Sequence, residues 1–172
     1  MYPLRNVPPS LSNAWLRFNN VFPHFCSTPI MLTTSPDFRH SMTVRVYYED
    51  TDAGGIVFYA NYLKFMERGR TEWLRSVGVN QSDVAREFQR VFIVTGLDIR
   101  YKKSAKLDDL LEINSAVTRL GRASLHFAQT ITRNGELLTE SNIQIGCVDT
   151  VNMRVAAIPE SVRIKFAATT QE

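Results

Sequence analysis

Residues 47–62 read YYEDTDAGGIVFYANY, and this stretch determines how the rest of the chain is interpreted. Before it, Val44, Val46 and Tyr48 alternate with polar residues over 43–49, which is the two-residue period of a half-buried strand. After it, apolar residues recur at the 3.6-residue spacing of one helical face: Tyr59, Tyr62, Leu63, Met66, Trp73, Leu74 and Val77. The two adjacent glycines favour a tight turn, so the sequence predicts a sharp carboxylate-bearing loop between a strand and a long helix.

The remaining pattern predicts an antiparallel sheet. Gly78 suits the end of the long helix, and a shorter helix is predicted from Ser82-Asp83 to about Gln89. Strand-like stretches follow at 91–101, 110–119, 124–133 and 137–148, and a short closing strand is predicted at 162–166. Asn134-Gly135 is the signal of a type I′ hairpin. Because strand–helix–strand units do not repeat, the predicted class is α+β, with an antiparallel sheet around one long helix.

Length and charge place limits on the class of protein. The 172 residues fit one domain plus a tail and can bury a core without disulfides. Residues 1–42 carry a net charge of +2, which leaves +1 for the rest of the chain. The body is therefore almost neutral, which argues against a nucleic-acid-binding protein. Apolar runs stay well short of the ~18 residues that span a bilayer.

The two cysteines, Cys26 and Cys147, lie far apart without a CxxC spacing. This pattern suggests neither a zinc site nor a disulfide framework. A reducing, cytoplasmic setting is the simplest interpretation.

The composition of residues 1–42 differs from that of the body, with no lysine and several prolines, asparagines and serines. Three interpretations stay open: a transit peptide, a disordered tail, or a start of translation at Met31 or Met42. We place no function there. The predicted organisation is an N-terminal extension at 1–42, a domain at 43–166 and a short tail at 167–172.

Familiar catalytic motifs are missing from the sequence. It contains no GxSxG, GxGxxG or P-loop pattern. Of the three histidines, His24 and His40 fall in the extension and His126 in a predicted strand, so a Ser-His-Asp arrangement is poorly supported. No cofactor or metal ion is predicted.

The loop at Asp50-Thr51-Asp52 is the remaining candidate. It leads into a helix start, where unpaired N–H groups and the helix dipole can stabilise an oxyanion. A nearby carboxylate can attack a carbonyl or activate water. A thioester suits such a small set of groups, because thiols have pKa values near 8.5 and leave without much acid assistance. The alternative is that these residues are ordinary turn and cap residues.

The motif resembles a known family. Residues 47–57, followed by Asn61-Tyr62 and the run 67–70, are similar to the signature of the 4-hydroxybenzoyl-CoA thioesterase group of the hotdog-fold superfamily. Within that superfamily, the likeness points to the bacterial acyl-CoA thioesterases associated with the Tol–Pal system. It extends over about 43–166, through 107–109, Ser124-Leu125 and 147–149. It implies a hotdog fold, in which about five antiparallel strands wrap around one long helix.

The resemblance also implies roles for single residues. Asp52 matches the catalytic aspartate, the backbone N–H of Tyr59 matches the oxyanion donor, and Tyr48 matches a tyrosine near the aspartate. Where the chain has Tyr59, the Tol–Pal-associated members commonly have histidine, and this difference bears mainly on the substrate. Arg122 matches a basic position that contacts the nucleotide of CoA. The other predicted substrate-binding residues are Gly55, Ile56, Val57, Phe58 and Tyr62.

Together these observations predict a cytoplasmic acyl-CoA thioesterase that releases CoA and a carboxylic acid. Asp52 acts in it as nucleophile or as general base, and both routes stay open. The resemblance implies a homo-oligomer, either a dimer or a homotetramer built as a dimer of dimers, with active sites between subunits. The predicted partner is the acyl-CoA substrate, with no nucleic acid and no transmembrane segment. The alternative function is a non-catalytic hotdog domain that binds acyl groups or proteins of lipid synthesis or the cell envelope.

Overall fold

The computed structural model describes residues 38 and 40–169. The predicted extension at 1–42 therefore lies almost entirely outside the described residues, as does the end of the predicted tail. The boundaries proposed for the domain stay predictions.

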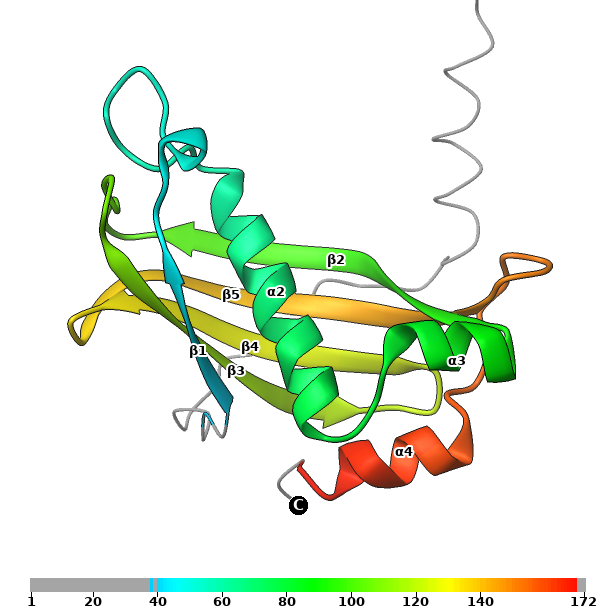
Figure 1. The fold of residues 1–172 in the computed structure, drawn as a ribbon. Coiled ribbons are helices and arrows are strands. Elements are labelled where there is room, and N and C mark those ends of the chain that lie inside the picture. The colour runs from blue at the N-terminus through cyan, green and yellow to red at the C-terminus, as the bar shows by residue number, and fades with distance from the viewer. Residues whose placement is uncertain (1–37, 39, 170–172) are drawn as a thin grey trace, which may run out of the picture. The chain divides into compact units, whose positions relative to one another are not determined.

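Five strands form one antiparallel sheet: β1 (His40–Arg45), β2 (Arg90–Tyr101), β3 (Leu110–Leu120), β4 (Ser124–Arg133) and β5 (Glu136–Asp149). Their order across the sheet is β1-β3-β4-β5-β2 (Figure 1). The predicted hairpin at Asn134-Gly135 joins β4 to β5, and both residues have the positive φ of a type I′ turn. Four of the six predicted strand regions, at 91–101, 110–119, 124–133 and 137–148, are confirmed to within one residue at each end.

The long helix α2 (Asn61–Ser76) crosses one face of this sheet (Figure 1). Its C-cap is Val77, one residue before the predicted Gly78, and Gly78 follows with a φ of +71°. The N–H groups of Gly78 and Val79 bond to the carbonyls of Arg75 and Leu74, which is the paired pattern of a Schellman end. The shorter helix α3 (Gln81–Phe88) follows, with Asn80 capping its first turn.

The core lies between α2 and the sheet. Phe65 and Met66 of the helix and Ile113 and Ile131 of the sheet are fully buried. Midway along the helix, Gly69 permits a close approach, because a Cβ there would meet Ile113 Cγ2 at 2.7 Å. Five antiparallel strands against one long helix confirm the predicted α+β hotdog fold.

Three local predictions were wrong. The first strand begins and ends earlier than predicted, because Tyr48–Asp50 turn into a short 3-10 segment, η1. The long helix begins at Asn61, so Tyr59 lies in the turn before it. Residues 162–166 belong to the helix α4 (Glu160–Ala167), which buries Val162 and Phe166 and exposes Ile164.

Candidate active site

The loop between η1 and α2 is a tight hairpin. Thr51 and Val57 form an antiparallel bridge, and Asp52 N–H donates to the carbonyl of Ile56 at 3.0 Å. Gly55 N–H donates to the carbonyl of Asp52 at 3.0 Å. Gly55 has a φ of +70°, a conformation in which glycine is strongly preferred. The predicted sharp loop is confirmed.

Asp52 presents its carboxylate at the surface of this loop. One oxygen, Oδ1, accepts a hydrogen bond from the N–H of Gly54 at 2.8 Å. Among the described residues, the other oxygen has no hydrogen-bond partner, and no cation pairs with the group. A carboxylate held at one oxygen and open at the other is oriented but still able to take a proton or attack a carbon.

Asp50 has a different environment and is buried. Its Oδ2 accepts from Tyr47 N–H at 3.0 Å, while its carbonyl accepts from Phe58 N–H and from Asn61 Nδ2, each at 2.9 Å. Asp50 therefore holds the hairpin against the first residue of α2. This confirms the interpretation of Asp50 as a residue that shapes the loop.

Tyr59 lies in the turn that leads into α2. Its carbonyl accepts a hydrogen bond from Tyr101 Oη at 3.0 Å, and the turn is closed by Asn61 N–H bonding to the carbonyl of Phe58. Within the described part of the chain, the backbone N–H of Tyr59 has no acceptor. An unpaired N–H at the entrance of a helix is the kind of donor that an oxyanion requires.

Aromatic rings surround this turn. The rings of Tyr59 and Tyr101 meet edge to face with centroids 6.4 Å apart, and Tyr101 meets Tyr62 in the same way at 5.6 Å. Tyr48, Phe58, Tyr59 and Tyr101 are all exposed. An exposed aromatic cluster beside a free carboxylate suits a ligand with an apolar group.

Tyr62 differs from the other aromatic residues because it is buried. Its hydroxyl accepts a hydrogen bond from Ala105 N–H at 2.9 Å, and the carbonyl of Ala105 accepts from Val57 N–H at the same distance. Burial raises the pKa of the Tyr62 phenol, and the Ala105 contact offsets only part of this effect. The Tyr62 and Val57 side chains therefore pack into the core and position the loop from behind.

The predicted substrate-binding residues fall into two groups. Gly55, Ile56 and Phe58 lie on the hairpin beside Asp52, with Val57 and Tyr62 beneath them. Arg122 lies far from them, in the turn after β3. That strand starts near the loop, since Asp109 bonds to Val46, and its 11 residues extend for about 36 Å. Within one subunit, the chain does not bring Arg122 to Asp52.

The residues beside Arg122 line a hollow of about 460 Å³ that also includes Arg90 and Arg163. Arg90 bonds to Asp149 at 2.5 Å, and Arg163 forms a two-bond pair with Glu160. Arg122 has no ion-pair partner among the described residues. The hollow is therefore basic, with one guanidinium available to an anion.

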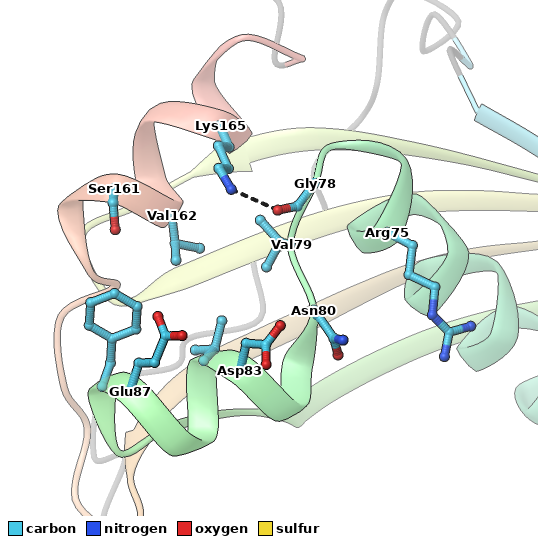
Figure 2. A pocket seen from close by; sticks show the side chains of 11 residues that line it. Arg75, Gly78, Val79, Asn80, Asp83, Glu87, Ser161, Val162 and Lys165 are labelled. Atoms are coloured by element: carbon cyan, nitrogen blue, oxygen red, sulfur yellow. Dashed lines mark hydrogen bonds between the residues drawn. The ribbon is translucent and has the colours of Figure 1, made fainter.

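A separate hollow of about 380 Å³ lies between α3 and α4 and the end of α2 (Figure 2). Asp83, Glu87 and Ser161 line it, and Lys165 Nζ bonds to the carbonyl of Gly78 across one side. Its lining residues include no histidine that would activate Ser161. It lies one helix length, about 24 Å, from the start of α2, so we assign the chemistry to the Asp52 loop.

Sequence reasoning missed three residues that hold the site together: Asn61, Tyr101 and Ala105. Their contacts join segments up to 43 residues apart, as in the bond from Ala105 to Tyr62. Tyr101 ends a strand-like pattern and Asn61 is the first polar residue of a helical pattern, so the sequence predicts the element to which each belongs. Nothing in the sequence indicated their partners.

Two features are absent from the described part of the chain. No group of three His, Cys, Asp or Glu residues there is placed to hold a metal ion. Likewise, none of the described helices combines the length and the apolar character needed to cross a membrane.

Sheet, helix and loop together define the hotdog class of thioesterases, and comparison with known proteins agrees. The family model described as the thioesterase superfamily matches residues 54–140. The acyl-CoA thioesterase YbgC of Haemophilus influenzae is 44% identical over 130 residues, covering 76% of this chain and 96% of that protein. The acyl-CoA thioester hydrolase YbgC of Escherichia coli O6:H1 is 42% identical, covering 72% and 92%. The chain belongs to the thioesterase superfamily.

Solved structures agree with this assignment. The probable thioesterase from Bartonella henselae superposes with a TM-score of 0.67 at 32% identity, covering 70% of this chain and 98% of that one. A 1,4-dihydroxy-2-naphthoyl-CoA thioesterase from Synechocystis has a TM-score of 0.69 at 18% identity, covering 74% and 95%, and shows the shared fold. The resemblance found in the sequence is confirmed.

Proposed function

We propose that this protein hydrolyses acyl-CoA thioesters and that Asp52 is its catalytic carboxylate. The observation that carries the proposal is the pairing of two open groups on one rigid loop. The Asp52 carboxylate has one free oxygen, and the Tyr59 N–H has no acceptor among the described residues. The activity in the names of the YbgC relatives supports the same reaction.

The Tyr59 N–H supplies the oxyanion contact in this proposal. As the carbonyl carbon of the thioester becomes tetrahedral, negative charge develops on its oxygen. A donor fixed in position before the reaction stabilises that charge by about 3–4 kcal/mol in known oxyanion holes. The Phe58 carbonyl, which shares a peptide unit with this N–H, accepts from Asn61 N–H. The bond from Tyr101 to the Tyr59 carbonyl fixes the peptide unit that follows, and the start of α2 adds its dipole.

Asp52 acts by one of two routes. As a general base it takes a proton from water, whose oxygen joins the carbonyl carbon as the carbon–sulfur bond breaks. As a nucleophile it forms an anhydride with the acyl group, which water then cleaves. CoA leaves as a thiolate in both routes and is protonated afterwards, so no second acid is required. Trapping of an acyl-enzyme by hydroxylamine distinguishes the nucleophilic route.

The exposed rings of Phe58 and Tyr59 contact the acyl group in this proposal, with Gly55 and Ile56 shaping the approach. Tyr48, which is exposed beside the loop, lies near the reacting carbonyl. The ring cluster suits an aliphatic or an aromatic acyl group, so the substrate class is acyl-CoA in general.

We infer that the working form is a homo-oligomer, a dimer or a dimer of dimers, in the cytoplasm. The distance between Arg122 and the Asp52 loop supports the oligomer. If Arg122 contacts the phosphates of CoA, it must come from a second copy of the chain. A basic hollow that holds an unpaired guanidinium suits this role.

The test is release of free thiol from a panel of acyl-CoAs, from short aliphatic to benzoyl. We expect Asp52→Asn to lower kcat by at least about a hundredfold, because general-base catalysis contributes about 10²–10⁴. The matched control is Glu49→Gln, which removes an exposed carboxylate three residues away and should retain activity. Turnover that survives Asp52→Asn contradicts the role of Asp52. If the wild type cleaves no member of the panel, the chain is instead a non-catalytic hotdog domain that binds acyl groups or proteins.

A further inference from the structure

The segment that follows β5 exposes an apolar tip. Val151 is 75% exposed and Met153 is 56% exposed, and Val155 beyond them is also exposed. Large apolar side chains grouped on a surface usually mark a contact with another molecule. The tip belongs to residues 149–155, here called the β5 hairpin.

Hydrogen bonds from Asp149 hold the β5 hairpin in one conformation. Its Oδ1 accepts from Val151 N–H at 2.9 Å and from Asn152 N–H at 3.2 Å, and its own N–H donates to the carbonyl of Arg154 at 2.9 Å. The Asn152 and Val151 contacts hold the pKa of the Asp149 carboxyl below its usual value, and Arg90 adds to this effect. The exposed apolar tip is thus a fixed surface.

The β5 hairpin lies at the opposite end of β2 from the proposed active site (Figure 1). Thr150 N–H bonds to the carbonyl of Gln89, and Asp149 pairs with Arg90, the first residue of β2. The last residue of β2, Tyr101, bonds to Tyr59. One strand therefore connects two exposed apolar surfaces, one at each end.

The outer edge of β2 has no neighbouring strand among the described residues, since the sheet order ends there. A bulge between Val94 and Gly96 places Val94 and Leu97 on the same side, opposite Ile145 and Ile143. Both residues are nearly half exposed, and they line a groove of about 500 Å³ beside α2. A long edge with exposed apolar residues is suited to pairing with another strand.

A second copy of the chain fits this edge by symmetry. When two copies of β2 pair antiparallel about a two-fold axis, the start of β2 in one copy lies beside the end of β2 in the other. If the axis passes between Val94 and Leu97, Val94 of each copy lies opposite Leu97 of the other, and the pairing covers both residues. It also brings Arg90 beside Tyr101 of the partner subunit, because each lies four residues beyond the axis pair.

We propose that the β5 hairpin of one subunit covers the Tyr59–Tyr101 surface of its partner, where Val151 and Met153 form one wall of the acyl site. This inference rests on the proposed thioesterase function and names residues that set its specificity. The apolar tip then contacts the exposed rings at the rim of the site, and the acyl group lies against both. The same pairing brings Arg122 toward the end of the partner subunit's sheet that carries the active-site loop.

The first experiment changes the wall alone. The double variant Val151→Ser/Met153→Ser should raise KM at least about tenfold for the larger acyl groups and change it little for acetyl-CoA, since apolar contacts discriminate by size. Ile164→Ser is the matched control, because Ile164 is 60% exposed but lies on α4. Equal effects of the double variant on all acyl groups, or the same change in the control, overturn the inference.

The second experiment tests whether the wall comes from the partner. Asp52→Asn subunits are paired with Val151→Ser/Met153→Ser subunits, and the mixed dimers are purified with two tags. If the hairpin acts across the interface, one of the two sites combines Asp52 with an unchanged hairpin. The mixed dimer should then show the wild-type KM and about half the wild-type kcat. A KM equal to that of the hairpin variant overturns the inference, because the wall then belongs to the same subunit as Asp52.

Thiol release by the wild type tests the proposed function itself, and an absence of turnover would contradict that function. A disulfide test then decides the placement of the hairpin independently. Under oxidation, Met153→Cys/Tyr59→Cys should give a covalent dimer, whereas Ile164→Cys/Tyr59→Cys should not. A failure of the first pair to cross-link sinks the inference, whatever the activity.

Discussion

Tyr101 Oη donates a hydrogen bond of 3.0 Å to the carbonyl oxygen of Tyr59, 42 residues earlier in the chain. The bond ties the end of β2 to the turn in front of α2. The Tyr101 phenol stays protonated and able to donate, because burial raises its pKa and the neighbouring Tyr59 and Tyr62 add to the shift. The peptide unit that follows the proposed oxyanion donor is thereby held in place.

Removal of this bond should affect catalysis more than stability. We expect Tyr101→Phe to lower kcat about tenfold, because the Tyr59 peptide loses its fixed orientation. The free energy of unfolding should fall by only about 1 kcal/mol, the usual net contribution of one hydrogen bond. Steady-state kinetics and urea unfolding measure the two effects. An unchanged kcat would show that the Tyr59 turn is held by other contacts.

Much of the fold was predictable because local sequence patterns determine its strands and turns. The strands alternate apolar and polar residues, and Gly55 and Gly135 mark turns that need a positive φ. The 162–166 segment shows the limit of this approach. Val162, Ile164 and Phe166 alternate as in a strand, but Val162 and Phe166 are also four apart. They share a helical face in α4, which leaves Ile164 exposed.

The candidate site was predictable only in part. Asp52 and Tyr59 lie on one short segment, so the sequence itself brings them near each other. Tyr101 and Ala105 reach that segment only through the pairing of distant strands and the turn that follows them, which no local pattern encodes. The separation of Arg122 from Asp52 likewise depends on the length and direction of β3.

The contact between α2 and the sheet predicts a strong effect at Gly69. Alanine favours helices over glycine by about 1 kcal/mol, but a Cβ here would meet Ile113 Cγ2 at 2.7 Å and Gln129 Nε2 at 3.1 Å. Since overpacking of a core costs about 1–3 kcal/mol, the steric effect should prevail and Gly69→Ala should destabilise the protein. Chemical denaturation measures the change.

A double-mutant cycle identifies the cause. Ile113→Ala removes the methyl group that the new Cβ would meet, although it also leaves a cavity. The cost of Gly69→Ala should therefore be smaller in the Ile113→Ala background. Equal costs in the two backgrounds would mean that the methyl group is not the obstacle.

Cys147 predicts a pH dependence of stability. It is fully buried, and burial raises the pKa of its thiol to about 11, against a small opposing effect of Arg90. In the unfolded chain the thiol loses its proton near pH 8.5, so above this pH the unfolded state is favoured. The free energy of unfolding should fall between about pH 8.5 and pH 11, by at most about 3.4 kcal/mol.

The comparison with Cys147→Ala isolates this effect from other titrating groups. The variant has a cavity and a lower stability overall, but the difference from the wild type should shrink as the pH rises from 9 to 11. A difference that stays constant across this range would contradict the raised pKa.

Two asparagines provide a matched test of the loop anchor. Asn61 Nδ2 donates to the carbonyl of Asp50 at 2.9 Å beside the Asp52 hairpin, and Asn80 Oδ1 accepts from Ser82 N–H at 3.2 Å at the other end of α2. Each replacement by alanine removes one side-chain bond to the backbone, so each should cost about 1–2 kcal/mol of stability. Only Asn61→Ala frees the hairpin that carries Asp52, so it alone should lower kcat, by about tenfold or more. Thiol-release kinetics at a temperature where both variants are folded make the comparison. Equal losses of kcat would trace the effect to stability, whereas a loss confined to Asn61→Ala would tie the rate to the position of the Asp52 carboxylate.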